Sequence, residues 1–174
     1  MDEPLVLLIS GSMGTGKTTL LGEASDLLSA RNVVHAAFDL DAMGLLLLPE
    51  AQSRELHYRN LAMFYDNCRE AGIKRFLFAA AIESREALND LARAMGNPIV
   101  TVCRLIASQA TMEDRLRTRE VGIRQHEFLE RSKTLSSILD AASVEDFWIE
   151  NDGHNVTAVA EEMLVRANWI TVNR

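Results

Sequence analysis

The sequence predicts an α/β fold in which a five-stranded parallel sheet is covered by helices on both faces. Short apolar runs without polar alternation, typical of strands buried on both faces, recur along the chain. Segments with apolar residues at helical spacing lie between these runs, so that strands and helices alternate. The length of 174 residues is that of one domain, and we therefore expect residues 1–174 to form a single unit.

The chain starts with a pattern typical of a βαβ unit. Residues 5–9 form an uninterrupted apolar run, and a glycine-rich turn follows at once. Apolar side chains then recur at helical spacing over 20–28, and Arg31 and Asn32 end that helix. A strand pattern resumes over 33–38. The first two strands are therefore expected to be parallel.

The middle of the chain repeats the alternation. A helix is expected over 53–71, with Gly72 as its terminator, before a strand over 73–80. The next helix, over 85–95, also ends at a glycine and leads to a strand over 99–103.

The last third of the chain supplies two further helices, a strand and a closing helix. Ser108 can cap a helix over 109–119, and a glycine separates it from a helix over 125–140. The strand is expected over 147–149, and the closing helix begins near 156.

The motif GSMGTGKT at 11–18 fits the pattern GxxxxGK[ST] and lies between a buried strand and a helix, as this pattern requires. Its backbone N–H groups can cradle phosphates together with the positive end of the helix dipole. Lys17 can contact the β- and γ-phosphates, and the Thr18 hydroxyl can bind Mg²⁺. We therefore expect a three-layer P-loop NTPase fold with ATP and Mg²⁺ as cofactors. The residues expected at the nucleotide are Gly11, Ser12, Met13, Gly14, Thr15, Gly16, Lys17, Thr18 and Thr19.

Two carboxylates, Asp39 and Asp41, follow the second strand, and the two-residue period of a strand sends both to one side. Asp41 is predicted to be the base that accepts the proton of an acceptor hydroxyl, with Asp39 on the metal side. Either residue could instead cap the following turn. The third strand ends without the acid that many P-loop proteins have there, so Glu83 is the alternative to Asp39 unless it serves only the first turn of the next helix.

The P-loop, the Asp-x-Asp after the second strand and the arginine-bearing helix after the fourth resemble the small P-loop kinases, which include shikimate kinase, gluconate kinase, adenylylsulfate kinase and chloramphenicol phosphotransferase. In shikimate kinase the second carboxylate of Asp-x-Asp lies at the acceptor hydroxyl, and this resemblance points to Asp41. It also implies a small helical lid over about 109–125, with Arg115 and Arg119 as catalytic arginines. These two share a helix face, whereas Arg117 lies opposite. The alternative is that these arginines only form the charged, solvent-exposed side of this helix.

The predicted function is an ATP-dependent phosphotransferase that moves the γ-phosphoryl group to a hydroxyl of a small metabolite or antibiotic-like molecule. A nucleoside monophosphate kinase, with Arg54 or Arg59 at the acceptor phosphate, and a nucleotide-binding regulatory ATPase module are the alternatives. The leucines at 45–48 could line an apolar acceptor pocket or belong to the core. Residues 151–154 could hold the adenine base or form a plain turn.

Composition limits the partners. A net charge of −7 and a pI near 5.1 disfavour extended nucleic acid. The apolar run 5–9 is too short for a signal peptide or membrane span, so we expect a cytoplasmic protein without membrane contact. Cys68 and Cys103 form no CxxC motif and are interpreted as buried free thiols. A monomer and a homodimer are both compatible with the sequence.

Overall fold

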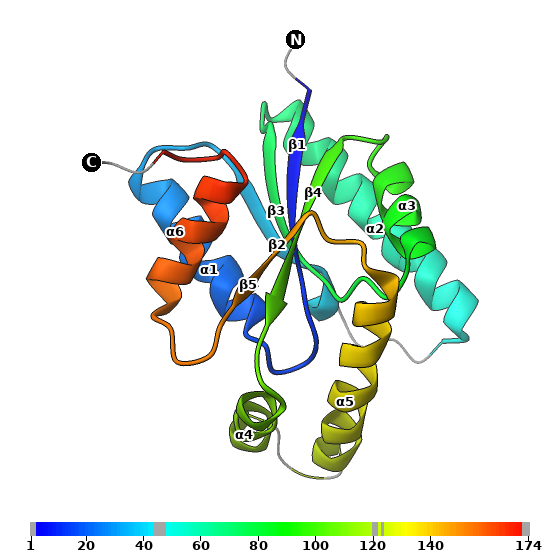
Figure 1. The fold of residues 1–174 in the computed structure, drawn as a ribbon. Coiled ribbons are helices and arrows are strands. Elements are labelled where there is room, and N and C mark those ends of the chain that lie inside the picture. Colours follow the sequence, from blue (N-terminus) through cyan, green and yellow to red (C-terminus); the bar gives the residue numbers. More distant parts are fainter. Residues whose placement is uncertain (1–2, 44–47, 120–121, 123, 172–174) are drawn as a thin grey trace.

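The computed structural model describes residues 3–43, 48–119, 122 and 124–171, and a five-stranded parallel sheet with the order β2-β3-β1-β4-β5 runs through it (Figure 1). The strands are β1 (Leu5–Ser10), β2 (Ala36–Asp39), β3 (Arg75–Ala79), β4 (Ile99–Ile106) and β5 (Phe147–Glu150). The helices are α1 (Lys17–Ala30), the 3₁₀-helix η1 (Leu40–Ala42), α2 (Glu50–Glu70), α3 (Arg85–Ala94), α4 (Gln109–Arg119), α5 (Arg124–Ala142) and α6 (Val156–Arg166). The predicted fold class is confirmed.

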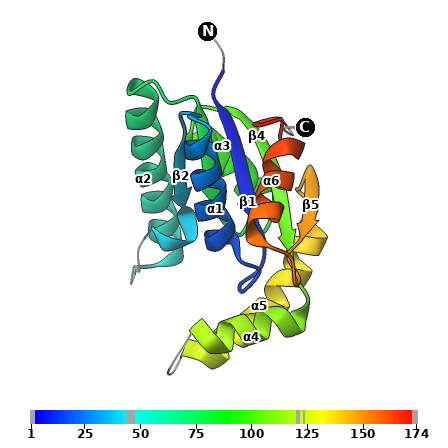
Figure 2. The same ribbon diagram turned by 90° about the vertical axis from the view of Figure 1, so that its left-hand side faces the viewer.

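Helices cover both faces of the sheet and give three layers (Figure 2). Along β1, Leu7 and Ile9 pack into the core formed with α1 and α6, whereas Val6 and Leu8 pack into the core formed with α2 and α3. All four side chains are buried. Burial of an aliphatic side chain contributes about 1.5–3 kcal/mol, so an apolar run with no polar position is what a central strand requires.

Several element boundaries differ from those predicted, and β4, for example, extends to Ile106. At two of these boundaries local hydrogen bonds end or extend the element. The Val33 N–H donates to the Leu28 carbonyl at 2.9 Å, so the turn after α1 continues and β2 starts only at Ala36. The Ser53 N–H donates to the Pro49 carbonyl at 3.0 Å. This bond closes a polar first turn of α2, which has no apolar spacing to predict it.

The two cysteines have different surroundings. Both are free thiols, but only Cys103 is buried, and burial raises its pKa to about 12. Cys68, near the end of α2, is half-buried. The prediction of a free thiol is therefore confirmed for Cys68, but the prediction that it is buried was wrong, because it is only half-buried.

Helices α4 and α5 extend beyond the carboxyl ends of the strands (Figures 1 and 2). The Ser108 Oγ accepts a hydrogen bond from the Thr111 N–H at 3.3 Å, as expected of the cap of α4. Leu135 and Leu139 anchor α5 in the interior. Residues 120, 121 and 123 of the predicted lid region lie outside the described residues, and closure of this region stays a prediction.

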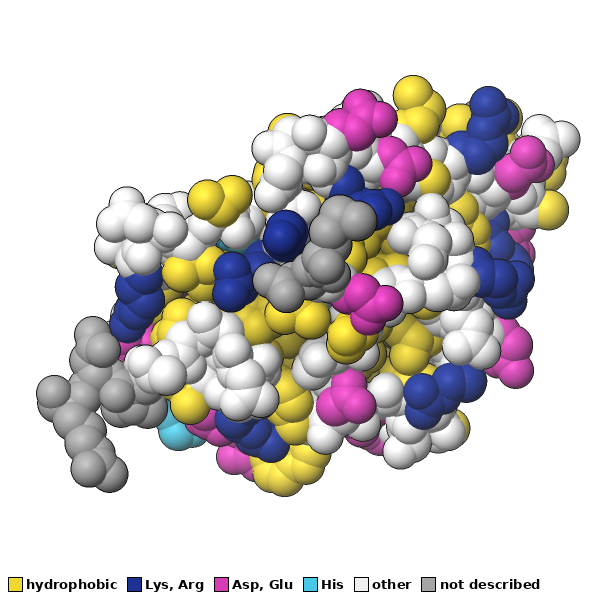
Figure 3. All heavy atoms as spheres, turned by 90° about the horizontal axis from the view of Figure 1, so that it is seen from above, with side chains coloured by type: hydrophobic (Ala, Val, Ile, Leu, Met, Phe, Trp, Pro, Cys, Tyr) yellow, Lys and Arg dark blue, Asp and Glu magenta, His cyan; other side chains and the backbone are white. Residues whose placement is uncertain are grey.

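The opposite end of the molecule, seen in Figure 3, carries basic and acidic side chains interspersed with hydrophobic ones. Within the described residues, every helix is either too short or too polar to cross a bilayer.

Candidate functional site

A cavity of about 290 Å³ lies over the P-loop at the carboxyl ends of the strands, and we call it the P-loop cavity. Its lining residues are Ser12, Met13, Gly14, Gly16, Lys17, Thr18, Thr19, Asp39, Asp41, Ala42, Arg119 and Phe128. Seven of the nine residues predicted at the nucleotide line it. The other two, Gly11 and Thr15, lie in the loop but outside the lining: Gly11 accepts a hydrogen bond from Lys17 at 3.0 Å, and Thr15 is buried.

Only glycine fits two positions of the loop. Gly16 caps α1 with φ of 100°, and a Cβ there would lie 2.7 Å from the Asn151 Nδ2. Gly14 has φ of 83°, and a Cβ there would lie 2.6 Å from the Met112 carbonyl oxygen. At both positions the backbone is left-handed and a neighbouring atom lies too close for a Cβ, so only glycine is tolerated. The loop is consequently packed directly against α4 and the end of β5.

Side chains from distant parts of the chain hold the P-loop carbonyls from outside. Asn151 donates through Nδ2 to the Thr15 carbonyl at 2.7 Å. Arg115 donates to the carbonyls of Gly14 at 3.3 Å, Thr15 at 3.0 Å and Asn151 at 2.9 Å. With these carbonyls engaged from outside, the loop geometry suits N–H groups that face a phosphate. The structure thus places Arg115 behind the loop, and it is not among the residues that line the cavity.

The segment after β5 also fixes the start of α4. The Asp152 carboxylate accepts a hydrogen bond from the Ser108 N–H at 2.7 Å. Burial would raise the pKa of Asp152, but hydrogen bonds from Ser108 and Thr111 and the charge of Arg115 hold it below its usual value. Asn151 and Asp152 therefore support the P-loop and α4, and the predicted contact with an adenine base stays a prediction.

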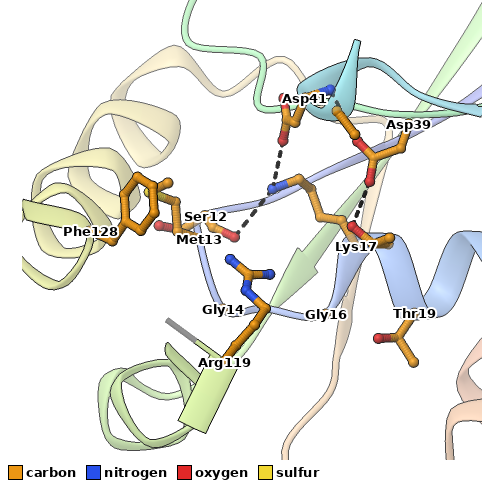
Figure 4. Close-up of a pocket in the computed structure, with 12 residues that line it drawn as sticks. Ser12, Met13, Gly14, Gly16, Lys17, Thr19, Asp39, Asp41, Arg119 and Phe128 are labelled. Carbon is orange, nitrogen blue, oxygen red and sulfur yellow. Dashed lines mark hydrogen bonds and ion pairs between the residues drawn. The ribbon is translucent and has the colours of Figure 1, made fainter. Parts of the chain in front are cut away.

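Lys17 connects the P-loop to the end of β2. Its ammonium group lies 3.1 Å from the Asp41 Oδ2 (Figure 4). The Lys17 side chain is only 9% exposed, whereas that of Asp41 is 47% exposed. Asp41 also accepts a hydrogen bond from the Ala81 N–H at 3.3 Å, just beyond β3. The carboxylate of Asp41 is therefore held between the P-loop lysine and the end of β3.

Asp39 reaches the first turn of α1. The Thr18 hydroxyl donates to the Asp39 Oδ2 at 2.5 Å, and the Asp39 Oδ1 accepts from the Asp41 N–H at 3.0 Å. Asp39 therefore caps η1 and also meets the predicted metal-binding hydroxyl. The argument from strand alternation was wrong, because β2 ends at Asp39 and the chain turns into η1. It is this turn that brings both carboxylates to the cavity.

Glu83 is paired elsewhere. Its carboxylate forms an ion pair with Arg131 of α5 at 2.5 Å, and it is not among the residues that line the P-loop cavity. Of the two candidate acids, Asp39 is therefore the one that lines the P-loop cavity.

Two of the three arginines of α4 face the P-loop, and the third does not. Arg119 lines the P-loop cavity and reaches toward the loop from the end of α4 (Figure 4). Arg117 turns to Glu113, 2.9 Å away. Arg115 and Arg119 thus lie on the loop side of the helix, as their spacing predicts, and Arg117 does not.

A second cavity, of about 510 Å³, adjoins Asp41, and we call it the side cavity. It lies between η1, α2, the end of β3 and α3, and its lining residues are Leu40, Asp41, Leu48, Glu50, Ser53, Arg54, His57, Tyr58, Ala80, Ala81, Ile82, Ala87 and Leu91. Among the residues that the structure describes, Asp41 alone lines both cavities. Burial lowers the pKa of His57, although the Asp41 carboxylate opposes this shift.

The sequence matches no protein-family model and no curated protein sequence. Among solved structures, a sugar kinase from Janibacter sp. HTCC2649 is 18% identical, with 94% of each chain covered and a TM-score of 0.64. APS kinase from Mycobacterium tuberculosis, in complex with AMPPNP and APS, is 13% identical, with 97% of this chain and 99% of that chain covered and a TM-score of 0.66. Shikimate kinase from Acinetobacter baumannii, in complex with shikimate, is 16% identical, with 98% and 97% covered and a TM-score of 0.59. This chain has the fold of the small P-loop kinases.

The donor set of this P-loop kinase fold suits a magnesium ion. The Thr18 hydroxyl and the Asp39 carboxylate, which are hydrogen-bonded to each other, are both hard oxygen ligands beside the P-loop. Mg²⁺ usually takes one or two protein ligands and completes its shell with water and nucleotide phosphates. A site with only these two side chains therefore fits the ion.

Sequence reasoning missed His57 and Tyr58 of α2 in the side cavity, and it named Arg54 only as a candidate partner of an acceptor phosphate. The predicted apolar face of this helix includes Leu61 and Tyr65, and the same stripe continued toward the N-terminus passes through His57, Tyr58 and Arg54. That continuation is the signal that could have found them. Of the leucines at 45–48, Leu48 lines the side cavity, and the other three lie outside the described residues.

Proposed function

We propose that the protein is an ATP-dependent kinase that transfers the γ-phosphoryl group to a hydroxyl of a small molecule. The observation that supports this most strongly is the position of Asp41, where the P-loop cavity and the side cavity meet. A nucleotide bound by the P-loop would place its phosphates at Lys17, and a molecule in the side cavity would approach from the other side of Asp41. Donor and acceptor would then meet beside one carboxylate.

Asp41 would act as the general base. A neutral hydroxyl must lose its proton as the oxygen attacks, and a carboxylate within hydrogen-bond reach can accept it. When nucleotide phosphates draw the Lys17 ammonium away, the Asp41 carboxylate gains a free lone pair, while the Ala81 N–H keeps it in place. Asp41 would thus be oriented before the acceptor binds.

The remaining residues would bind and neutralise phosphate charge. Lys17 and Arg119 would contact the transferring group, and Thr18 and Asp39 would hold Mg²⁺, which offsets the negative charge on the phosphates. Arg115 would keep the P-loop carbonyls turned outward and would thus be a positioning residue, with no contact to the reacting atoms.

A nucleoside monophosphate is a poorer acceptor for this site. Arg54 is paired with Glu50 at 2.6 Å, and Arg59 is not among the residues that line the side cavity. A monophosphate needs no base, and carboxylates about 4 Å away would oppose it by roughly 1–4 kcal/mol each. A regulatory ATPase has no use for a second cavity that opens on the same carboxylate. Both alternatives are therefore disfavoured.

The test is an assay of ADP formation with MgATP over two groups of compounds. Common nucleoside monophosphates form one group, and hydroxylated metabolites and hydroxylated antibiotics form the other. We expect ADP formation to be stimulated only by members of the second group, and to fall when Asp41 is replaced by Asn. Efficient phosphorylation of a monophosphate that Asp41→Asn leaves intact would contradict the proposal.

A further inference from the structure

The walls of the side cavity away from Asp41 are mostly apolar. They come from four parts of the chain: η1, the start of α2, the end of β3, and α3. The apolar lining residues are Leu40, Leu48, Ala80, Ala81, Ile82, Ala87 and Leu91. Ligand sites are typically concave, largely apolar and about 300–1,000 Å³ in volume, with a few polar groups that fix orientation. At about 510 Å³, this cavity has the size and the lining of such a site.

The charges at this cavity are already balanced. Asp41 pairs with Lys17 at 3.1 Å, and Arg54, the one cation among the described lining residues, pairs with Glu50 at 2.6 Å. Burial lowers the pKa of His57, which favours its neutral imidazole. A carboxylate or phosphate in this cavity would meet two acids and one cation that is already paired.

A second space adjoins this cavity, between two helices. A groove of about 540 Å³, which we call the outer groove, lies between α2 and α3 and is lined by Ala51, Arg54, Glu55, Tyr58, Asp90, Arg93 and Ala94. Arg54 and Tyr58 line both the side cavity and the outer groove, so the two adjoin at these side chains. Arg93 and Asp90 form an ion pair at 2.9 Å, so charge is balanced here too. Figure 1 shows α2 and α3 on the same side of the sheet.

Resting on the kinase function proposed above, we propose that the acceptor is an uncharged molecule with an apolar body that spans both spaces. Its hydroxyl lies at Asp41, and its body passes Tyr58 into the outer groove. Neutral His57 and the Tyr58 hydroxyl offer it hydrogen bonds without adding charge. An acceptor as small as a single sugar would leave the outer groove empty, and an anionic acceptor would lack an unpaired cation.

Matched pairs of probes test the charge of the ligand. Uridine is compared with uridine 5′-monophosphate, and methyl shikimate with shikimate, by calorimetry on the full chain saturated with Mg²⁺ and AMPPNP. Chloramphenicol serves as a larger neutral probe. We expect the neutral member of a pair to bind at least about tenfold more tightly than the anionic one, a difference that calorimetry resolves. Tighter binding of the anionic member, or the failure of all three neutral probes to bind, overturns the proposal.

Arg54→Gln provides a second test of charge, because the Glu50–Arg54 pair is exposed and Arg54 could turn toward an anion. Because Arg54 lines both spaces, its replacement changes packing against neutral and anionic probes alike, so the readout is the ratio of affinities within a matched pair, which should stay within tenfold of the original ratio. A shift of tenfold or more against the anionic member overturns the proposal, because it would mean that the charge of Arg54 holds an anion. Unchanged AMPPNP affinity shows that the variant is folded.

Ala51→Trp tests the length of the ligand. Ala51 is exposed on α2 and lines only the outer groove, so a tryptophan there fills the groove without contacting Asp41. Ala141→Trp, at an exposed position of α5, is the matched control. We expect Ala51→Trp to weaken binding of the tightest neutral probe at least about tenfold, and the control to leave it unchanged. Equal affinity in both variants overturns the proposed extension into the groove.

The two proposals fail in different ways. If a neutral probe binds as expected but MgATP never phosphorylates it or any other hydroxyl compound, the kinase function is contradicted and the ligand class is upheld. If phosphoryl transfer occurs only to anionic acceptors, the kinase function is upheld and the ligand class is contradicted.

Discussion

The P-loop cavity and the side cavity meet at Asp41, but they are built from different parts of the chain. The P-loop cavity is formed mainly by one contiguous segment, and Asn151 and Arg115 hold its backbone by hydrogen bonds. The side cavity is formed by side chains of several elements, with α2 supplying many of them. Backbone groups can bind phosphate in almost any nucleotide, whereas a wall of side chains can select one molecule. The first cavity therefore suits nucleotides in general, and under the proposed function the second would select the acceptor.

The largest expected effect comes from removing the cation of the P-loop cavity. Lys17→Ala should lower phosphoryl transfer about 10³-fold, because a buried ammonium that stabilises transferring charge is lost and Asp41 loses its partner. Single-turnover assays of ADP formation measure this loss. Lys74→Ala, at an exposed position before β3, is the control and should be silent. A Lys17→Ala variant as active as this control would remove the P-loop cavity from the proposed reaction.

A smaller loss should follow at the junction of the two cavities. Asp41→Asn should lower phosphoryl transfer about 10²-fold, the scale of a lost general base. Nucleotide affinity should stay the same or increase, because Lys17 no longer has a competing carboxylate partner. Calorimetry with Mg²⁺ and AMPPNP separates the two effects. Asp39→Asn is the matched comparison and should instead raise the Mg²⁺ concentration needed for half-maximal activity; identical behaviour of the two variants would contradict their separate roles.

The support of the P-loop from outside predicts a loss of stability. Asn151→Ala removes a buried hydrogen bond of 2.7 Å to the Thr15 carbonyl and should lower the free energy of unfolding by about 1–3 kcal/mol. Nucleotide affinity should fall as well, because the loop is less fixed. Urea denaturation checks the first effect and calorimetry the second. Asn67→Ala, at an exposed position of α2, should change neither; an equal effect at both positions would argue against this clamp.

The smallest expected effect concerns pH at the side cavity. Burial lowers the pKa of His57 from its ordinary value of 6.5, so the unfolded chain takes up this proton at a higher pH than the folded protein does. Above about pH 6.5 His57 has no effect on the pH dependence of stability. As pH falls from about 6.5 toward the lowered pKa of His57, the free energy of unfolding decreases. His57→Gln should weaken this acid sensitivity, as measured by urea denaturation between pH 5 and 7.5. His126→Gln, at an exposed position, is the control; equal slopes in both variants would contradict the burial effect.

The sequence by itself determined the order of the strands and the P-loop, and it marked the two carboxylates but not the turn that brings both to the cavity. Residues 5–9 form a strand covered on both faces because every side chain in the run is apolar, and this requirement is local. The glycines at 14 and 16 indicate left-handed backbone, and this signal is also local because the conformation depends on a single residue. Element ends were less predictable, because the polar first turn of α2 and the turn after α1 depend on hydrogen bonds that leave no periodic pattern.

The tertiary structure alone decided how these pieces work together. Arg115 and Thr15 are 100 residues apart, and Asn151 and Thr15 are 136 residues apart, yet both contacts shape the P-loop. The side cavity likewise exists only because α2 and α3 pack on one face of the sheet, which brings Tyr58 to the same space as the end of β3. Periodicity reports which face of an element is buried, but not which other element covers it. Partners across such distances follow from packing of the whole chain.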